Sequence, residues 1–310
     1  MTTITASMVK DLRERTGVGM MDCKKALNEN DGNIDAAIDW LRAKGLSKAA
    51  KKSDRVAAEG LVGVIASGKQ GALAEVNAET DFVARNEQFQ DMVRNITSLA
   101  PEATGDTAKL LAATYPGKAE SVEAVLTEAI ATIGENMTLR RSAVVSVGEG
   151  VVADYVHNKV SDGLGKIGVL VALESSGDAD KLLAFGRQLA MHVAAAAPLA
   201  LTPDELDSDT IEKERAIYLE QAQASGKPQE IIEKMVEGRL RKEYFQQVVL
   251  LQQTFVVDGK ATVEQAVKAF EKELASPVKV AQFVRYALGE GIEKKEDDFA
   301  AEVAAAAGTN

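Results

Sequence analysis

Residues that form covalent cross-links or metal sites are scarce in this chain. It has one cysteine, Cys23, and two histidines among 310 residues. An internal disulfide framework is therefore excluded, and a structural zinc site lacks its usual ligands. A lone thiol fits a reducing compartment, so we expect a cytoplasmic protein. Aromatic residues make up only 5% of the chain while alanine is abundant, which favours helices packed through small side chains.

Long apolar segments and an excess of positive charge are also missing. The most apolar segment, Leu182–Leu201, is interrupted by Arg187 and Pro198, so it predicts a buried helix and not a membrane span. The N-terminus has no apolar segment typical of a secretory signal. The net charge of −11 argues against a general nucleic-acid binder, because phosphate contacts need clustered Lys and Arg.

Catalytic motifs are absent as well. There is no P-loop, H-E-x-x-H, C-x-x-C or G-x-S-x-G pattern, and the glycine-rich run Gly163–Gly168 leads into a strand, whereas a dinucleotide fingerprint opens a helix. His192 lies on an apolar helix and is interpreted as a core histidine, and His157 as a surface residue. Cys23 is interpreted as an inert thiol. We therefore predict a binding protein that is not an enzyme and needs no metal and no cofactor.

The first 45 residues predict three short helices, near 7–15, near 20–27 and from Ile34. Three short helices form a marginal core, so this unit is expected to act as a docking module. The basic stretch Lys44–Arg55 follows without a strong apolar stripe. It is interpreted as a solvated linker, and the alternative is a positive strip that faces an acidic partner.

The middle of the chain shows one pattern of elements twice. Strands followed by helices are expected at 60–66, 71–77, 81–99 and 121–133, and again at 143–148, 151–156, 167–174 and 178–196. The runs that start at Gly71 and at Gly168 both pass from strand to helix to Ala-Pro over similar lengths. We interpret this similarity as a weak internal duplication of one α/β unit.

The second unit carries an insertion at 204–247, where two amphipathic helices flank the turn Ser225–Pro228 and predict an antiparallel helical hairpin. A helix near 263–274 and a strand near 278–288 follow, and an acidic helix ends the chain. We predict an α+β fold with four divisions: 1–54, 55–140, 141–289 with the hairpin, and 290–310.

The segment Thr80–Val83 places a phenylalanine at a polar turn. In one interpretation Thr80 or Asp81 caps a helix, and Phe82 packs inward in its first turn. In the other, Phe82 is an exposed anchor for another protein. The corresponding junction of the second unit, 175–180, keeps an acid but has no aromatic residue, which favours the partner.

Two longer segments carry a family resemblance. LRERTGVGMMDCKKAL (Leu12–Leu27) and EVNAETDFVAR (Glu75–Arg85) resemble the signature segments of the bacterial elongation factor Ts family, and AMHVAA, SGKPQEIIEKMVEGR and GEGIEKKEDDFAAEV extend the similarity over nearly the whole chain. Ala78 and the longer loop 157–166 depart from the family pattern. The resemblance implies a ubiquitin-associated-like N-terminal domain, two related α/β core halves with antiparallel sheets, a coiled-coil hairpin and a C-terminal helix.

The same resemblance implies guanine-nucleotide exchange on elongation factor Tu, the GTPase that delivers aminoacyl-tRNA to the ribosome. Thr80, Asp81, Phe82 and Val83 would insert near its bound Mg²⁺ and promote GDP release. Secondary contacts are implied for Leu12, Val18, Gly19, Met20, His157, Asp298 and Phe299. A homodimer or a 2:2 complex is the expected assembly, without direct nucleic-acid or membrane contact. The rival hypothesis is a holding protein whose N-terminal module recruits an unrelated partner.

Overall fold

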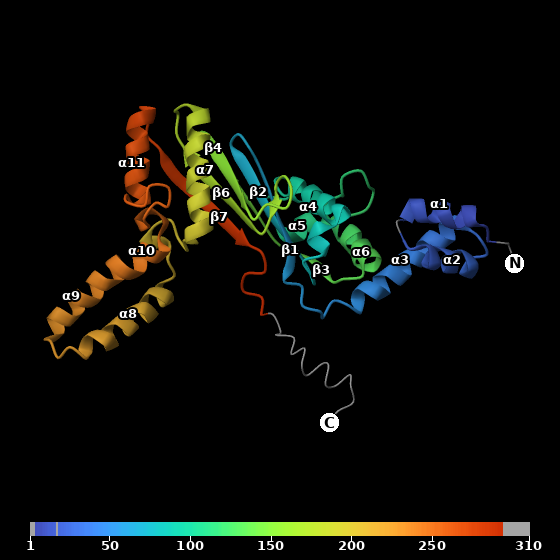
Figure 1. Cartoon of the computed structure of the whole chain (residues 1–310), viewed down its shortest axis with the longest axis horizontal. Helices are drawn as coiled ribbons and strands as arrows, with labels where there is room; N and C mark the ends of the chain where they lie inside the picture. The colour runs from blue at the N-terminus through green and yellow to red at the C-terminus, as the bar shows by residue number, and fades with distance from the viewer. Residues whose placement is uncertain (1–3, 17, 294–310) are drawn as a thin grey trace, which may run out of the picture.

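Two antiparallel sheets form the centre of the molecule, and helices cover the outer face of each sheet (Figure 1). The computed structural model describes residues 4–16 and 18–293. The first sheet has the order β3-β2-β1-β5, and its strands are β1 (Glu59–Ser67), β2 (Gln70–Ala78), β3 (Met137–Ser146) and β5 (Leu164–Gly165). The second has the order β4-β6-β7, with β4 (Gly150–His157), β6 (Ile167–Glu174) and β7 (Lys279–Ala287). The mixed α+β class with antiparallel sheets is therefore confirmed.

Side chains of the strands alternate between two cores. In β6, Val169 and Val171 belong to the core shared with helices α7 (Ala179–Ala196) and α11 (Val263–Leu274). Leu170, between them, belongs to a separate core between the two sheets. Successive residues of a strand point to opposite faces, so a strand buried on both faces reads as a continuous apolar run. This explains the sequence IGVLVALE in β6.

Glycines allow the two sheets to approach each other. A Cβ atom at Gly168 of β6 would lie 2.7 Å from methyl carbons of Val62 and Val64 in β1. A Cβ atom at Gly71 of β2 would lie 2.7 Å from Cδ2 of Leu170. Each sheet thus presents a glycine to apolar side chains of the other, and a larger residue would push the sheets apart.

We expect Gly168→Ala to lower the free energy of unfolding by about 1–3 kcal/mol, the usual cost of overpacking a core. Urea unfolding followed by circular dichroism measures this loss. Gly148→Ala is the matched control, because a Cβ atom there meets no other atom within 4 Å. Equal midpoints for the two variants would contradict the predicted packing of the sheets.

The helices of the first sheet are α4 (Glu87–Leu99), α5 (Thr107–Ala112) and α6 (Val122–Ile133). The helix expected from residue 81 was placed too early, because α4 begins at Glu87. Asn86 caps it by accepting a hydrogen bond from the Phe89 amide at 3.2 Å. Before this cap, Val83–Arg85 form a separate 3₁₀ turn, η1.

Strand β3 starts earlier than the expected strand at 143–148 and pairs along the whole of β2. The short strand β5 pairs with β1 at Val62 and Gly63. The first sheet therefore contains strands from both sides of residue 140, where we expected one division of the chain to end. Backbone pairing between distant segments decides which sheet a strand joins.

The N-terminal helices are α1 (Ala6–Thr16), α2 (Met20–Glu29) and α3 (Ile34–Ala50). The linker interpretation of Lys44–Arg55 is wrong as far as Ala50, because α3 continues through it. Lys44 and Lys48 hold Asp22 of α2 at 2.7 and 2.9 Å. Hydrogen bonds from Lys44 and then Lys48 lower the pKa of Asp22 to about 2.

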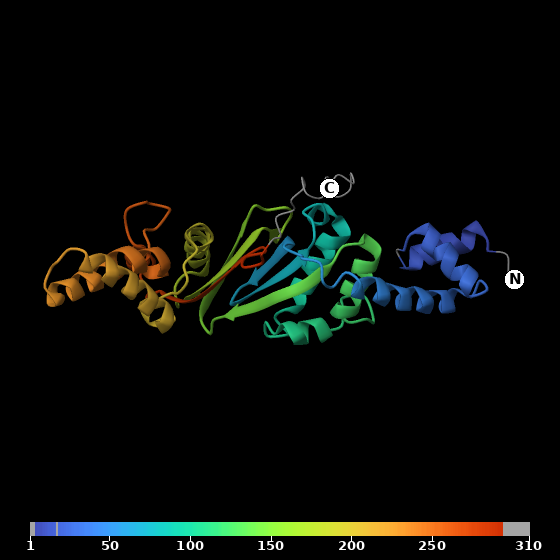
Figure 2. The ribbon, with the colours of Figure 1, turned by 90° about the horizontal axis from the view of Figure 1, so that it is seen from below.

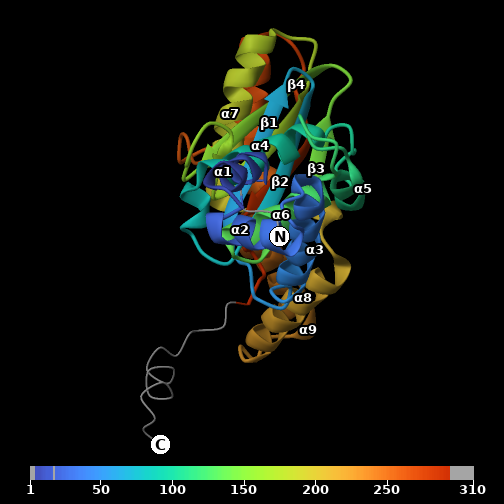
Figure 3. The ribbon, with the colours of Figure 1, turned by 90° about the vertical axis from the view of Figure 1, so that its right-hand side faces the viewer.

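The insertion forms the expected helical hairpin of α8 (Ser208–Gln223) and α9 (Gln229–Arg239). A π-helical turn, Leu240–Tyr244 (η3), leads from α9 into α10 (Phe245–Val248), and short 3₁₀ turns lie at Pro203–Glu205 (η2) and Leu250–Gln252 (η4). The hairpin and the N-terminal helices lie at opposite ends of an elongated molecule (Figures 1 and 2). Seen from the N-terminal end, α1–α3 lie in front of the sheets (Figure 3). Within 4–16 and 18–293, no helix is both long and apolar enough to cross a membrane.

Candidate partner-binding site

Phe82 lies on the turn between β2 and α4, and 72% of its surface is exposed. The next residue, Val83, is buried in the core beneath the turn. The interpretation in which Phe82 packs inward and Thr80 or Asp81 caps the helix is therefore wrong, because Asn86 caps α4. A large aromatic ring held in solvent leaves apolar area uncovered, which is typical of a binding anchor.

The residue before Phe82, Asp81, is also exposed, and its carboxylate has no partner among the described residues. Thr80 is held firmly by contrast. Its backbone amide and its hydroxyl donate hydrogen bonds of 2.9 and 2.7 Å to the two carboxylate oxygens of Glu135. The turn thus exposes one carboxylate that is unpaired within the described residues and one aromatic ring, while the backbone at Thr80 is fixed.

A second hydrogen bond, in the opposite direction, also holds the backbone at the start of the turn. The amide of Asn136 donates to Oε1 of Glu79 at 2.5 Å, so each of two acids binds the backbone of the opposite segment. We call Glu79, Thr80, Glu135 and Asn136 the turn clamp. Because charge-assisted hydrogen bonds are about twice as strong as neutral ones, the clamp fixes the backbone from which Phe82 projects. Such preorganisation reduces the entropy lost on binding.

A second set of hydrogen bonds links the turn to the loop after β4. Gln90 Nε2 donates to the Ala84 carbonyl at 3.0 Å, and Gln90 Oε1 accepts from the Ser161 hydroxyl at 2.9 Å. Arg94 also donates to this hydroxyl, at 2.8 Å. The loop that follows His157 is therefore tied to the helix that follows Phe82.

His157, at the end of β4, is exposed as expected for a surface residue. Its ring stacks on Tyr155, and the Tyr155 hydroxyl lies 3.2 Å from its Nδ1. This contact orients the ring while leaving it available to a partner.

The N-terminal candidates differ in exposure. Leu12 is fully buried in the core of the three helices, so it supports that unit from inside. Gly19 is exposed and Val18 half-buried, while Met20 is 58% exposed. Met21, which sequence analysis did not single out, is 79% exposed and enlarges this apolar surface. Asp298 and Phe299 lie outside the described residues.

His192 and Cys23, the other residues considered for chemistry, are both buried. His192 is buried, its Nδ1 accepts from the Val256 amide at 3.3 Å, and its Nε2 donates to Gln253 Oε1 at 2.9 Å. Burial lowers the pKa of His192, so the ring is neutral, and burial raises the pKa of the Cys23 thiol. The prediction of a core histidine is confirmed, and the burial of Cys23 agrees with its interpretation as an inert thiol. In the described part of the chain, no group of three or more His, Cys, Asp or Glu is arranged to hold a metal ion.

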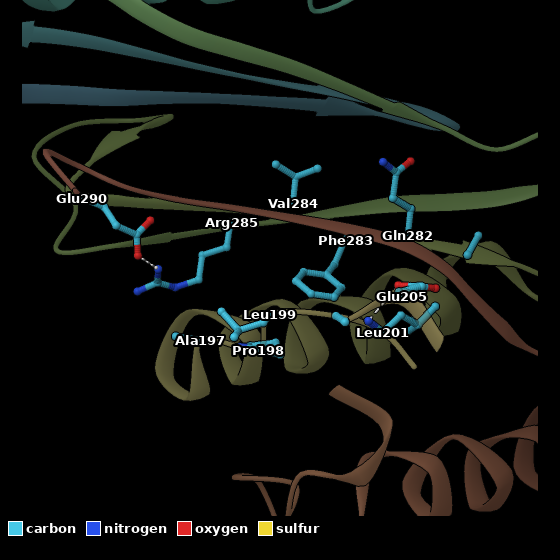
Figure 4. Close-up of a pocket in the computed structure, with 12 residues that line it drawn as sticks. Ala197, Pro198, Leu199, Leu201, Glu205, Gln282, Phe283, Val284, Arg285 and Glu290 are labelled. Carbon is cyan, nitrogen blue, oxygen red and sulfur yellow. Dashed lines mark hydrogen bonds and ion pairs between the residues drawn. The ribbon is translucent and has the colours of Figure 1, made fainter. Parts of the chain in front are cut away.

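A cavity of ≈ 590 Å³ lies away from the turn, between the outer edge of β7 and the segment that follows α7 (Figure 4). Its charged groups already have partners. Arg285 and Glu290 point toward one another and pair at 3.0 Å, and Glu205 accepts from the Leu201 amide at 3.0 Å. Each of the three charged residues that line this cavity is therefore already paired with another group.

Comparison with known proteins identifies the family. A family model described as Elongation factor TS matches residues 79–290. The chain is 61% identical over 307 residues to Elongation factor Ts of Parvibaculum lavamentivorans, with 99% of each chain covered. The chain belongs to the elongation factor Ts family. Other members of the elongation factor Ts family, from Rhizobium etli and Bartonella tribocorum, are 60% and 57% identical over 306 and 303 residues, covering 99% and 98% of each chain.

The clamp residues Glu135 and Asn136 of this elongation factor Ts family member escaped sequence analysis. Glu135 lies 55 residues beyond Thr80, and the two residues follow the helix-ending Gly134, where a polar pair looks like an ordinary loop. No local pattern signals their contact, because it depends on β2 and β3 pairing side by side.

Proposed function

We propose that this protein is a guanine-nucleotide exchange factor that binds elongation factor Tu in its GDP-bound form and promotes the release of GDP during translation elongation. Membership of the elongation factor Ts family supports this role. The observation that carries the proposal to particular residues is the 72% exposure of Phe82 on a clamped turn. In this role the protein acts by binding, in the cytoplasm, and catalyses no covalent reaction.

We further propose that the turn Thr80–Val83 inserts at the GTPase next to its Mg²⁺ and phosphate site, with Asp81 and Phe82 as the side chains that enter. Phe82 would occupy an apolar pocket, and Asp81, which has no partner among the described residues, would bind helix ends or polar groups beside that pocket. Val83 would stay in the core and hold the turn. Displacing the Mg²⁺ and the phosphate-binding loop would weaken the hold on GDP.

Secondary contacts are proposed for the surface formed by Val18, Gly19 and Met20, and for His157, with Leu12 supporting the first from within. Asp298 and Phe299 stay predictions, as do the four domain divisions and the homodimer or 2:2 assembly. We propose no direct contact with nucleic acid or a membrane.

Energetics require several contacts. An exchange factor must bind the nucleotide-free GTPase more tightly than the nucleotide-bound form, and this coupling is reciprocal. A thousandfold acceleration lowers the barrier by about 4 kcal/mol. Burying one phenylalanine contributes about 1.5–3 kcal/mol, so the other surfaces must supply the rest.

Release of fluorescent GDP from elongation factor Tu, with and without this protein, tests the proposal. We expect the release rate to rise with protein concentration and then to saturate. The rival holding protein would bind a partner without changing the release rate. An unchanged rate at saturating concentration would therefore reject exchange activity.

A further inference from the structure

The turn clamp also holds the chain that connects the N-terminal helices to the sheets. Asn136 Nδ2 donates to the carbonyl of Arg55 at 2.7 Å and to that of Ser53 at 3.4 Å. Lys52 donates to the carbonyl of Gly134, in the segment that leads into the clamp. Two consecutive residues, Glu135 and Asn136, therefore bind the Phe82 turn on one side and the connecting chain on the other.

Each of these contacts is directional. Glu135 uses both carboxylate oxygens on Thr80, one for the amide and one for the hydroxyl, so the direction of the chain entering the turn is fixed. Asn136 is only 9% exposed, and its side-chain amide is used by the connecting chain while its backbone amide binds Glu79. Arg55 of the connecting chain also reaches Glu79, at 3.5 Å.

We propose that Glu135 and Asn136 are positioning residues for exchange: Glu135 aims the Phe82 turn, and Asn136 keeps the N-terminal helices in register with it. This inference rests on the proposed function, since it concerns how two contact surfaces are presented to one GTPase. Neither residue needs to touch the partner. The Phe82 turn and the N-terminal helices are both held by Glu135 and Asn136. We therefore expect the partner to bind the two surfaces together, without a separate loss of conformational entropy for each.

The first test replaces Glu135 by alanine. We expect the maximal rate of GDP release at saturating protein to fall about tenfold, because the turn that carries Phe82 is no longer fixed. Hydrogen bonds to a charged group contribute more free energy than neutral ones, so their loss has a large effect. Glu128→Ala is the control, since Glu128 lies on α6, the helix that ends just before Glu135, and pairs with Lys118 at the surface, at 2.8 Å. Glu135→Gln keeps one acceptor oxygen and is expected to give an intermediate rate, and it replaces the alanine variant if that variant does not fold.

A double-mutant cycle separates positioning from general stability. If Glu135 acts through Phe82, then Glu135→Ala should change the rate less than about twofold in a Phe82→Ala background. A purely structural role would slow release by the same factor in both backgrounds, and that result would overturn the inference. Hydrogen exchange of the Thr80 amide gives an independent measurement: it should accelerate in Glu135→Ala, and unchanged protection would also count against the clamp.

The second test replaces Asn136 by alanine, which removes the bonds to Ser53 and Arg55 but keeps Glu135. We expect the protein concentration for half-maximal release to rise about fivefold while the maximal rate stays within about twofold. A fall in the maximal rate alone, without a change in the half-maximal concentration, would refute the assigned role of Asn136.

The outcomes distinguish this inference from the proposed function itself. If the wild-type protein does not accelerate GDP release, the proposed function fails and the clamp variants have no activity to modify. If the wild-type protein accelerates release and Glu135→Ala does so equally well, only the positioning role fails.

Discussion

Phe82→Ala is expected to reduce the maximal rate of GDP release from elongation factor Tu by about ten- to a hundredfold, because about 1.5–3 kcal/mol of apolar burial is lost in the transition state. The concentration for half-maximal release should change much less, since the other surfaces still bind. Stopped-flow release of fluorescent GDP at several protein concentrations separates the two quantities.

The matched control for Phe82 is Leu199→Ala, because Leu199 is 66% exposed but lines the cavity beside β7. We expect the control to release GDP at the wild-type rate. Both variants should keep the wild-type melting temperature, since neither side chain is buried. If Phe82→Ala released GDP at the wild-type rate, insertion of Phe82 would not drive release, and the proposed mechanism would lose its central residue.

Glu75→Ala is expected to lower the free energy of unfolding by roughly 3–5 kcal/mol, the cost of removing one partner from a buried ion pair. Glu75 is fully buried in β2. It accepts from Arg141 at 2.5 Å, from Arg140 at 3.1 Å and from the Gly289 amide at 2.9 Å. Its loss would leave two half-buried arginines of β3 without this acceptor and would remove one hydrogen bond to the chain after β7. Urea unfolding measures the change.

The same carboxylate gives a pH dependence with a definite sign. Burial by itself raises the pKa of Glu75, but the bonds from Gly289, Arg141 and Arg140 outweigh burial, and the net result is a pKa below the ordinary value of 4.5. A lowered folded-state pKa stabilises the protein above the unfolded-state pKa, and the contribution is lost as the pH falls below it.

Glu75→Gln isolates this contribution because it keeps the shape of the side chain and cannot titrate. Between pH 7 and about pH 3, the wild-type protein should lose more stability than Glu75→Gln, so that their unfolding midpoints converge in acid. The other carboxylates of the two proteins are the same and cancel in the comparison. Parallel curves would show that the Glu75 carboxylate is not held as the structure indicates.

The sequence predicted elements whose periodicity is local. The strand pair 60–66 and 71–77, the helical hairpin and the helix at 263–274 were found because apolar residues repeat within each segment. The first residue of α4 was predicted wrongly because Thr80, Asp81 and Asn86 are all acceptable N-caps. Only tertiary contacts decide which of them caps the helix. The sheet that β3 joins was missed for the same reason, since pairing with β2 is not a local property.

The candidate site was found in part. An aromatic residue at a polar turn pointed to Phe82, and the structure confirms its exposure. Glu135 accepts a hydrogen bond from Thr80, and Asn136 donates one to Glu79. These bonds join segments far apart in the chain, so no periodic sequence pattern marks them. The lack of a strong apolar stripe also hid the continuation of α3 to Ala50, because Lys44 and Lys48 are stabilised there by Asp22 of another helix.

The cap of α4 has an evolutionary consequence. Because Asn86 begins the helix and Glu135 holds Thr80, the exposed side chains of Asp81 and Phe82 neither cap α4 nor hold the turn. Side-chain substitutions at these two positions are therefore expected to cost little stability, and under the proposed function selection acts on them mainly through the partner. Under the proposed function, this turn and its GTPase could co-adapt one substitution at a time, and we expect an exchange of residues 81 and 82 between distant members of the family to change partner preference with little loss of stability.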